Sequence, residues 1–292
     1  MGFWGCPETA LNTIEGMRPL HPPVIHNSWQ SLRQFTAARI ALGRTGASLP
    51  TQPHLAFQLA HARARDAVHL ALDVPQLLRD LGNAGVASAQ DCLVLDSAAS
   101  DRLHYLQRPD LGRRLNEASR ARPKAPPLPP TERCHDIAFV VDDGLSALAI
   151  AQNVVPFLTA LRHRIMAEPW SQAPISIVRQ GRVAVGDEVA ELLGARLVLL
   201  LIGERPGLSS PDSMGIYLTW MPRVGLTDAN RNCVSNIRPA GLSCDEAAFK
   251  VHYLVSEMQK RQLSGVLLKD ESRGGSSLSG MRASNLLLRN SG

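Results

Sequence analysis

Aromatic residues are scarce in this chain of 292 residues, in which Phe, Trp and Tyr together make up only 4% of the sequence. Proteins that bind single-stranded nucleic acid stack the bases on aromatic side chains, so this scarcity argues against such a role. The net charge of +5 comes from basic residues that are scattered among acids and form no polybasic block. We therefore expect no nucleic-acid partner, because contact with a partner subunit explains an arginine-rich surface as well.

Long hydrophobic runs are also absent. A membrane-spanning helix needs about 20 consecutive apolar residues, and the longest apolar runs of this sequence are far shorter. The first residues lack the basic end and the apolar stretch that are typical of a signal peptide. We expect a cytoplasmic protein that does not contact a membrane.

Cysteines are few and poorly spaced for a zinc site or a disulfide framework. Their number is odd, no pair has C-x-x-C spacing, and the nine histidines are equally dispersed. The sequence has no Ser-His-Asp elbow, P-loop or H-E-x-x-H motif, so we expect no protein-held metal and no catalytic residue on this chain. The cysteines are Cys6, Cys92, Cys134, Cys233 and Cys244.

Five prolines within eight residues mark a change in the character of the chain. They predict a stiff linker at 123–131. Before it, 28–122 has the apolar spacing of a mainly helical region, which follows a flexible arm at 1–27. After it, 132–268 alternates strands with helices, and the Ser- and Gly-rich tail at 269–292 is expected to be disordered.

Strands that alternate with helices predict an α/β domain with a mostly parallel sheet. Buried strands are expected where short apolar runs are bounded by turn residues, and helices where apolar residues recur at helical spacing. The expected strands are 137–141, 175–178, 197–202 and, less regular, 216–220. The expected helices are 147–163, 187–193 and 244–262.

Two short loops follow strands at the edge where open α/β sheets bind ligands. The loop 203–208 places Glu204 directly after the most apolar strand, and the loop 142–146 joins a strand to a helix. Both are compatible with a ligand-binding loop or with an ordinary turn, since Asp143 or Ser146 is also a good helix cap.

Two further stretches are open to more than one interpretation. The residues 233–237 indicate a second short polar loop. In this loop Cys233 is better suited to line a pocket than to act as a nucleophile, because no His lies near it in sequence. The segment 108–114 is compatible with a phosphate-binding cluster or with a helix start capped by Asp110.

Together these stretches resemble the small (light) subunit of ethanolamine ammonia-lyase. The resemblance covers about residues 31–268 and rests on elements that occur in the order and at the spacing of that family. The elements are Arg39 with 43–46, 57–68, 105–115, 143–146, 181–183, 194–195, 203–208 and 231–237.

The resemblance implies a subunit of an adenosylcobalamin-dependent lyase that converts ethanolamine to acetaldehyde and ammonia by a radical mechanism. It implies a Rossmann-like α/β domain that covers the corrin ring and the nucleotide tail of cobalamin. The cofactor would lie at the interface with a barrel-shaped large subunit, which catalysis requires and which 28–122 would contact. Six copies of each subunit are implied, in the cytoplasm or in a bacterial microcompartment.

Three cobalamin contacts carry over from the motifs of the family, namely Val183, Glu204 and Cys233. A carboxylate such as Glu204 suits the amide N–H donors of the corrin rim, Val183 offers an apolar contact, and the small Cys233 lets the ring lie close. The further expected cofactor-binding residues are Asp143, Ser146 and Ser235.

The cofactor is expected to bind with its own base on cobalt, because no His of the sequence has an Asp two residues before it. The alternative to a lyase subunit is a stand-alone α/β module that binds a nucleotide-like ligand and has no catalytic activity.

Overall fold

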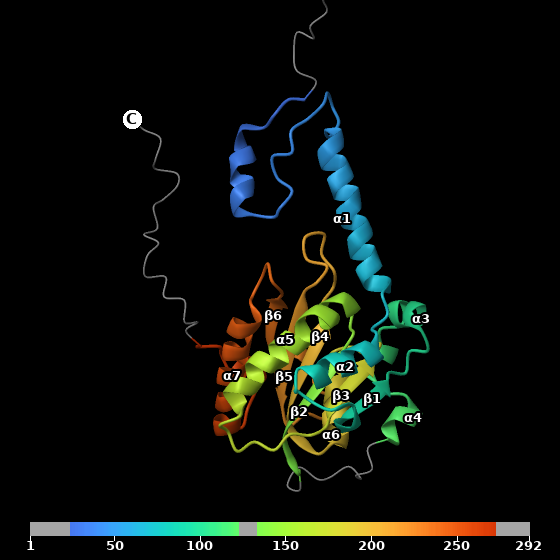
Figure 1. Cartoon of the computed structure of the whole chain (residues 1–292), viewed down its shortest axis with the longest axis vertical. Coiled ribbons are helices and arrows are strands. Elements are labelled where there is room, and N and C mark those ends of the chain that lie inside the picture. The colour runs from blue at the N-terminus through green and yellow to red at the C-terminus, as the bar shows by residue number, and fades with distance from the viewer. Residues whose placement is uncertain (1–23, 123–132, 273–292) are drawn as a thin grey trace, which may run out of the picture. The chain divides into compact units, whose positions relative to one another are not determined.

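The computed structural model describes residues 24–122 and 133–272 of the chain (Figure 1). It divides into two compact units, 1–60 and 61–292. The division therefore falls inside the region that the sequence predicts to be mainly helical. The predicted linker, most of the predicted arm and most of the predicted tail lie outside the described residues.

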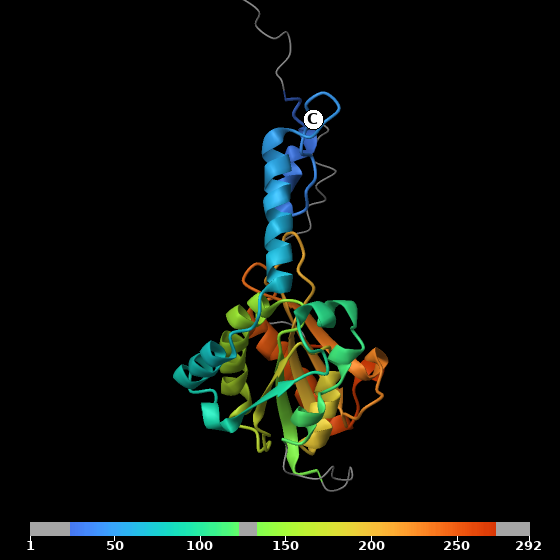
Figure 2. The same cartoon turned by 90° about the vertical axis from the view of Figure 1, so that its right-hand side faces the viewer.

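A six-stranded sheet is the centre of the second unit (Figures 1 and 2). The strand order is β1-β3-β2-β4-β5-β6, and the first four strands in that order pair in parallel. Strand β5 pairs antiparallel with both of its neighbours, so it runs against the other strands of the sheet. The strands are β1 (Cys92–Asp96), β2 (His135–Asp142), β3 (Ile175–Arg179), β4 (Ala195–Gly203), β5 (Met214–Trp220) and β6 (Arg231–Ile237).

The α/β class is confirmed, but the sheet is mixed and two of its strands differ from the sequence prediction. The segment 233–237 is part of strand β6 and not a loop. Its buried residues Arg231, Val234 and Ile237 are three apart because a bulge interrupts the pairing with β5, which hides the two-residue period of a strand. Strand β1 lies in the region predicted to be mainly helical and forms the opposite edge of the sheet.

The remainder of that region is helical only in part. Apolar spacing predicts a helix over 28–43, whereas the structure has a 3-10 helix, η1 (Ser28–Phe35), followed by a stretch without regular structure up to Pro50. The helices that follow are α1 (Thr51–His69), α2 (Val74–Asn83), α3 (Arg102–Gln107) and α4 (Glu117–Arg120). Short 3-10 turns are η2 (Ala89–Asp91), η3 (Leu111–Arg113), η5 (Asp228–Asn230) and η6 (Gly265–Leu267).

Helices cover both faces of the sheet, which explains why strand β4 is apolar at every position from 197 to 202. Alternate residues of β4 belong to two different cores, with Leu199 on the side of α5 (Ala147–Ile165) and α7 (Cys244–Arg261). Leu200 belongs to the core on the side of α6 (Val185–Leu192). A strand buried on both faces needs apolar side chains at every position.

The order of the strands determines where a ligand would bind. Strands β3 and β4 lie on opposite sides of β2, and right-handed crossovers to opposite sides place α5 and α6 on opposite faces. The connections therefore diverge at the carboxyl ends of β2 and β4, which leaves a crevice there. Among the described residues no helix is long and apolar enough to cross a membrane.

Candidate functional site

A cavity of about 390 Å³ lies at the carboxyl ends of strands β2 and β4, where the topology leaves a crevice. Val183 and Glu204, which the sequence predicts as ligand contacts, both line it. Residues from three other segments complete the wall. The other lining residues are Tyr105, Leu145, Arg182, Ile202, Gly203, Arg205 and Tyr217.

Glu204 is fixed by the turn that joins β4 to β5. Its carboxylate accepts a 2.5 Å hydrogen bond from the Ser213 hydroxyl and longer ones, of 3.4 Å, from the backbone N–H of Asn236. A Cβ on Gly215 would lie 2.8 Å from the carboxylate, so this glycine is required for the approach. A carboxylate has about four acceptor positions, and Glu204 therefore retains acceptor capacity for a ligand in the cavity.

Cys233 lies beside the cavity and opposite one of its lining residues. It is the cross-strand partner of Tyr217, and it is exposed on the edge strand β6. Partial burial of its thiol raises the pKa of Cys233, and burial raises the pKa of Tyr217 to about 12. A thiol with a raised pKa is neutral at physiological pH and is a poor nucleophile, so Cys233 is better suited to line a pocket than to act as a nucleophile.

The other three predicted residues do not line the cavity. Asp143 is buried and its carboxylate accepts a 2.7 Å hydrogen bond from the backbone N–H of Gln180. Ser146 is the N-cap of α5, where its hydroxyl accepts from Ala149 and donates to the carbonyl of Pro211. Ser235 is exposed on β6.

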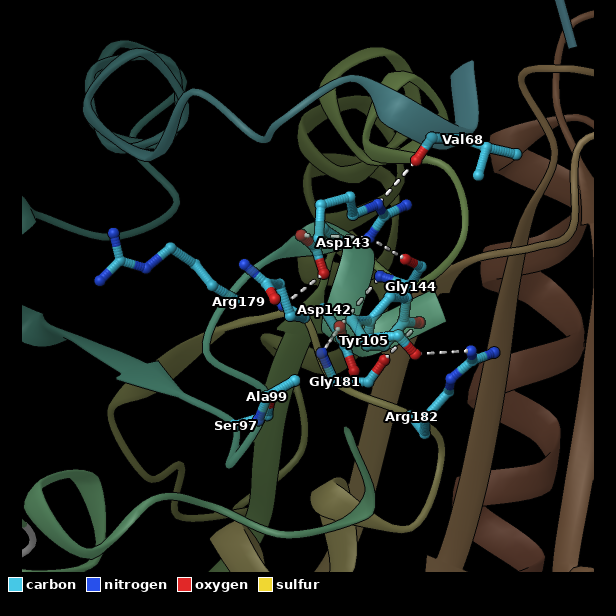
Figure 3. A network of polar contacts seen from close by, with 12 residues as sticks. Val68, Ser97, Ala99, Tyr105, Asp142, Asp143, Gly144, Arg179, Gly181 and Arg182 are labelled. Carbon is cyan, nitrogen blue, oxygen red and sulfur yellow. Dashed lines mark hydrogen bonds and ion pairs between the residues drawn. The ribbon is translucent and has the colours of Figure 1, made fainter. Parts of the chain in front are cut away.

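A buried polar network, which sequence reasoning missed, supports the loop that carries Val183 (Figure 3). The carboxylate of Asp142, at the end of β2, accepts hydrogen bonds from the backbone N–H groups of Gly144 and Gly181. Tyr105, fully buried, donates its hydroxyl proton to the carbonyl of Gly181 at 2.8 Å. The loop after β3 is therefore held at both its N–H and its C=O groups.

Arginine side chains surround the same network. Arg102 donates to the carbonyls of Val68 and Gly144, and its guanidinium lies 3.8 Å from the carboxylate of Asp143. The guanidinium groups of Arg102 and Arg182 lie 4.8 and 4.2 Å from the centre of the Tyr105 ring. Planar cations that stack on an aromatic ring are well oriented, so the network also positions Arg182 at the cavity wall.

Two adjacent buried carboxylates make this network sensitive to protonation. Burial raises the pKa of Asp142 well above its ordinary value, and the neighbouring charge of Asp143 adds to this. Burial also raises the pKa of Asp143, but the charge of Arg102 opposes this rise. When the two carboxyl groups share one proton, Asp142 therefore holds it. In the sequence, the feature that could have indicated this buried pair is the Asp-Asp-Gly turn directly after a strand.

The site has binding groups but no complete catalytic set. It offers one carboxylate acceptor, apolar and aromatic walls, and a stacked arginine, which together suit a ligand that has both apolar surface and hydrogen-bond donors. Within residues 24–122 and 133–272 there is no group of three or more His, Cys, Asp or Glu side chains that could hold a metal ion.

Comparison with known proteins identifies the family of this chain. Residues 26–269 match the family model described as ethanolamine ammonia-lyase light chain (EutC). The chain is 58% identical to an ethanolamine ammonia-lyase small subunit of Azotobacter vinelandii over 254 residues, which cover 86% of this chain and 91% of the relative.

Relatives of the same name occur in other bacteria. One from Pseudomonas putida (strain GB-1) is 58% identical over 258 residues, covering 86% of this chain and 90% of the relative. One from Pseudomonas aeruginosa (strain LESB58) is 58% identical over 248 residues, covering 84% and 88%. The chain therefore belongs to the ethanolamine ammonia-lyase light-chain family, whose members are subunits of a lyase.

Proposed function

We propose that this chain is the cobalamin-binding small subunit of an adenosylcobalamin-dependent ethanolamine ammonia-lyase, active only together with a large subunit. The observation that carries the proposal is that Val183 and Glu204, predicted from separate segments, line one cavity with Cys233 beside it. The cofactor would supply the radical chemistry when bound, and this chain would bind, orient and shield it.

The donor set of the cavity fits a corrin. The rim of that ring carries neutral amides, whose N–H groups match the carboxylate of Glu204, which keeps acceptor capacity beyond its bonds within the fold. Leu145, Val183 and the ring of Tyr217 provide apolar surface for the macrocycle. Asp143 and Ser146, whose polar groups are engaged within the fold, would support the nucleotide-tail side indirectly, and Ser235 would contact the ring edge from β6.

A partner subunit is supported by the first unit of the structure. Among its described residues, 24–60, only Pro50 is buried, whereas large apolar side chains are exposed. A segment that buries so little of its own surface needs another surface to cover it. The exposed side chains are Ile25, Trp29, Phe35, Ile40, Leu49, Leu55, Phe57 and Leu59.

We infer that this surface docks on the barrel-shaped large subunit. The assembly would hold six copies of each subunit, with the cofactor bound base-on between them. The Rossmann-like half would face the cofactor. The complex would work in the cytoplasm, with encapsulation in a bacterial microcompartment as an additional arrangement.

Reconstitution tests the proposal. The purified chain should show no ethanolamine deamination with adenosylcobalamin, and addition of the large subunit should produce acetaldehyde. Full turnover by the chain alone would refute the proposal. Tight ligand binding by the isolated chain, unchanged when the large subunit is added, would favour the alternative of a stand-alone binding module.

A further inference from the structure

A second cavity adjoins the first and is lined by arginines. Its volume is about 570 Å³, and it shares Arg182 and Val183 with the cavity that holds Glu204. Three more arginines line it, of which two come from the segment 108–114 that the sequence leaves ambiguous. They are Arg113, Arg114 and Arg231.

The positive charge of this cavity is only partly neutralised. Arg231 is paired with Asp187 in the protein interior, and Arg114 lies 3.3 Å from Glu188. Among the described residues neither Arg113 nor Arg182 forms an ion pair with a carboxylate. The Nε of Arg182 is also buried without a hydrogen-bond partner. Such a group favours an anion that can accept its hydrogen bond.

Carboxylates in the wall do not offset these two cations. Asp228 is the acid in the lining, but its side chain is 93% exposed and already contacts Arg231. Glu188 is shared between Arg114 and Arg120, so it compensates Arg114 only in part. The cavity therefore keeps a surplus of positive charge.

Helix α6 begins at the same wall. Its N-cap, Ala184, lines the cavity and has no side chain that could cap the first turn. The acids of this turn, Asp187 and Glu188, are directed to arginines. The first N–H groups of the helix, those of Val185 and Gly186, donate to the carbonyls of Arg182 and Val183, so the helix contributes its positive dipole end to the attraction that the arginines exert on an anion.

The two free arginines are held together by the backbone. The N–H of Arg182 donates a 2.7 Å hydrogen bond to the carbonyl of Gly112, directly before Arg113. A Cβ on Gly112 would lie 2.9 Å from both the Arg182 and the Tyr105 side chains. The segment 108–114 therefore packs closely against Arg182. Asp110 does not cap the helix turn that follows it, because its side chain pairs with Arg108 and makes no capping hydrogen bond.

We propose that this cavity binds a phosphate group through Arg113 and Arg182. The assignment of that group to the phosphodiester in the nucleotide tail of cobalamin rests on the proposed function, because the two cavities share a wall. Bidentate guanidinium contacts are the usual partners of phosphate oxygens in proteins. A free phosphate would meet the same groups, so the test must separate the two sources.

Three probes make this separation with the complex of the chain and its large subunit. Cobinamide lacks the nucleotide tail and its phosphate, cobinamide phosphate differs from it by that one group, and inorganic phosphate carries the group alone. We expect the complex to bind cobinamide phosphate roughly tenfold more tightly than cobinamide, as measured by visible-spectrum titration. Millimolar inorganic phosphate should weaken the binding of cobinamide phosphate and leave that of cobinamide unchanged.

Variants of the two arginines test whether they cause the preference for the phosphorylated probe. Arg113→Ala and Arg182→Ala should each reduce the preference for the phosphorylated probe by about threefold or more, and the double variant should abolish it. Arg196→Ala removes a charge at the opposite end of β4, where the arginine pairs with Asp136, and should keep the preference. Arg113 makes no ion pair among the described residues, so its variant is expected to fold, which circular dichroism checks.

The outcomes distinguish this inference from the proposed function. Equal affinities for the two cobinamides, or a preference that survives the double variant, would overturn the phosphate site while leaving cobalamin binding intact. If the complex binds neither corrinoid, the proposed function fails. Titration with inorganic phosphate, followed by 31P NMR, then shows whether the cavity binds phosphate. Phosphate binding that is lost in the double variant would then support a free-phosphate site, and no binding would overturn the inference.

Discussion

At the scale of single residues, we propose that Glu204 is a binding group and not an acid or base of the reaction. Replacement by Ala removes the acceptor, whereas Gln keeps one acceptor oxygen in place. We expect Glu204→Ala to raise the cobalamin concentration needed for half-maximal activity about tenfold or more, and Glu204→Gln to raise it less, with kcat nearly unchanged in both. A large loss of kcat at saturating cobalamin would mean that Glu204 takes part in proton transfer.

The raised pKa of Asp142 predicts that the stability of the folded chain depends on pH. Its folded pKa lies above its ordinary value because of burial, so over the window between these values the folded state holds a proton that the unfolded state has lost. Stability contributed by this group therefore falls as the pH rises through that window. Asp142→Asn cannot titrate and keeps the acceptor for Gly144 and Gly181.

The variant should consequently gain stability relative to the wild type as the pH rises from about 4 to about 8, measured by urea unfolding of the full chain. The exposed residue Asp66 offers a control, and Asp66→Asn should show no such trend. A stability difference for Asp142→Asn that stays constant with pH would contradict the assignment of the proton to Asp142.

At the scale of elements, the turn at Gly112 holds the arginine cavity together. Gly112→Ala would place a methyl group 2.9 Å from the side chains of Arg182 and Tyr105. Overpacking of this kind costs about 1–3 kcal/mol, so the variant should lose that much stability in urea unfolding and also lose part of its preference for phosphorylated corrinoids.

The same substitution in helix α2 is the matched control. The nearest atom to a Cβ on Gly82 is 3.9 Å away, and Ala is a better helix former than Gly by about 1 kcal/mol. Gly82→Ala should therefore leave stability unchanged or raise it. A Gly112→Ala variant as stable as the wild type would show that the turn can shift without cost.

The elements that the sequence predicts correctly are those with one dominant pattern. Strands β2, β3 and β4 are continuous apolar runs because helices cover both faces of the sheet. Helices α5 and α7 have clear helical periods because each buries one face. Strands β1 and β6 lie at the sheet edges. Strand β1 is only five residues long, and β6 has several polar residues and a bulge that breaks its period. Edge strands therefore give a weak signal in one sequence.

The candidate site could likewise be predicted only in part from the sequence. The place of Glu204 could be predicted because ligands bind at the carboxyl ends of strands in an open α/β sheet, whereas Val183 was implied by the family resemblance. The bonds from Asp142 to Gly181 and from Arg182 to Gly112 could not, because they join segments far apart in sequence by backbone groups, which carry no residue-specific signal.

At the scale of the whole molecule, we propose that the first unit is an interaction surface. Trp29 and Phe35 are 61% and 67% exposed. Replacing both by Ser should abolish co-purification with the large subunit, because aromatic anchors dominate the energy of interfaces, while the thermal unfolding of 61–292 stays the same. Leu103→Ser changes an equally exposed apolar residue of the second unit and should leave co-purification intact. Undiminished co-purification of the double variant would place the docking surface elsewhere.

Cobalamin binding by the assembled subunits is the most direct test of the account. The chain, the large subunit and their complex are each incubated with cobalamin and passed through a sizing column, and the visible spectrum of the protein fraction is recorded. We predict that cobalamin in its base-on form elutes with the complex and with neither subunit alone, and that Glu204→Ala lowers the amount retained. Equal retention by the large subunit alone, with no effect of Glu204→Ala in the complex, would contradict it.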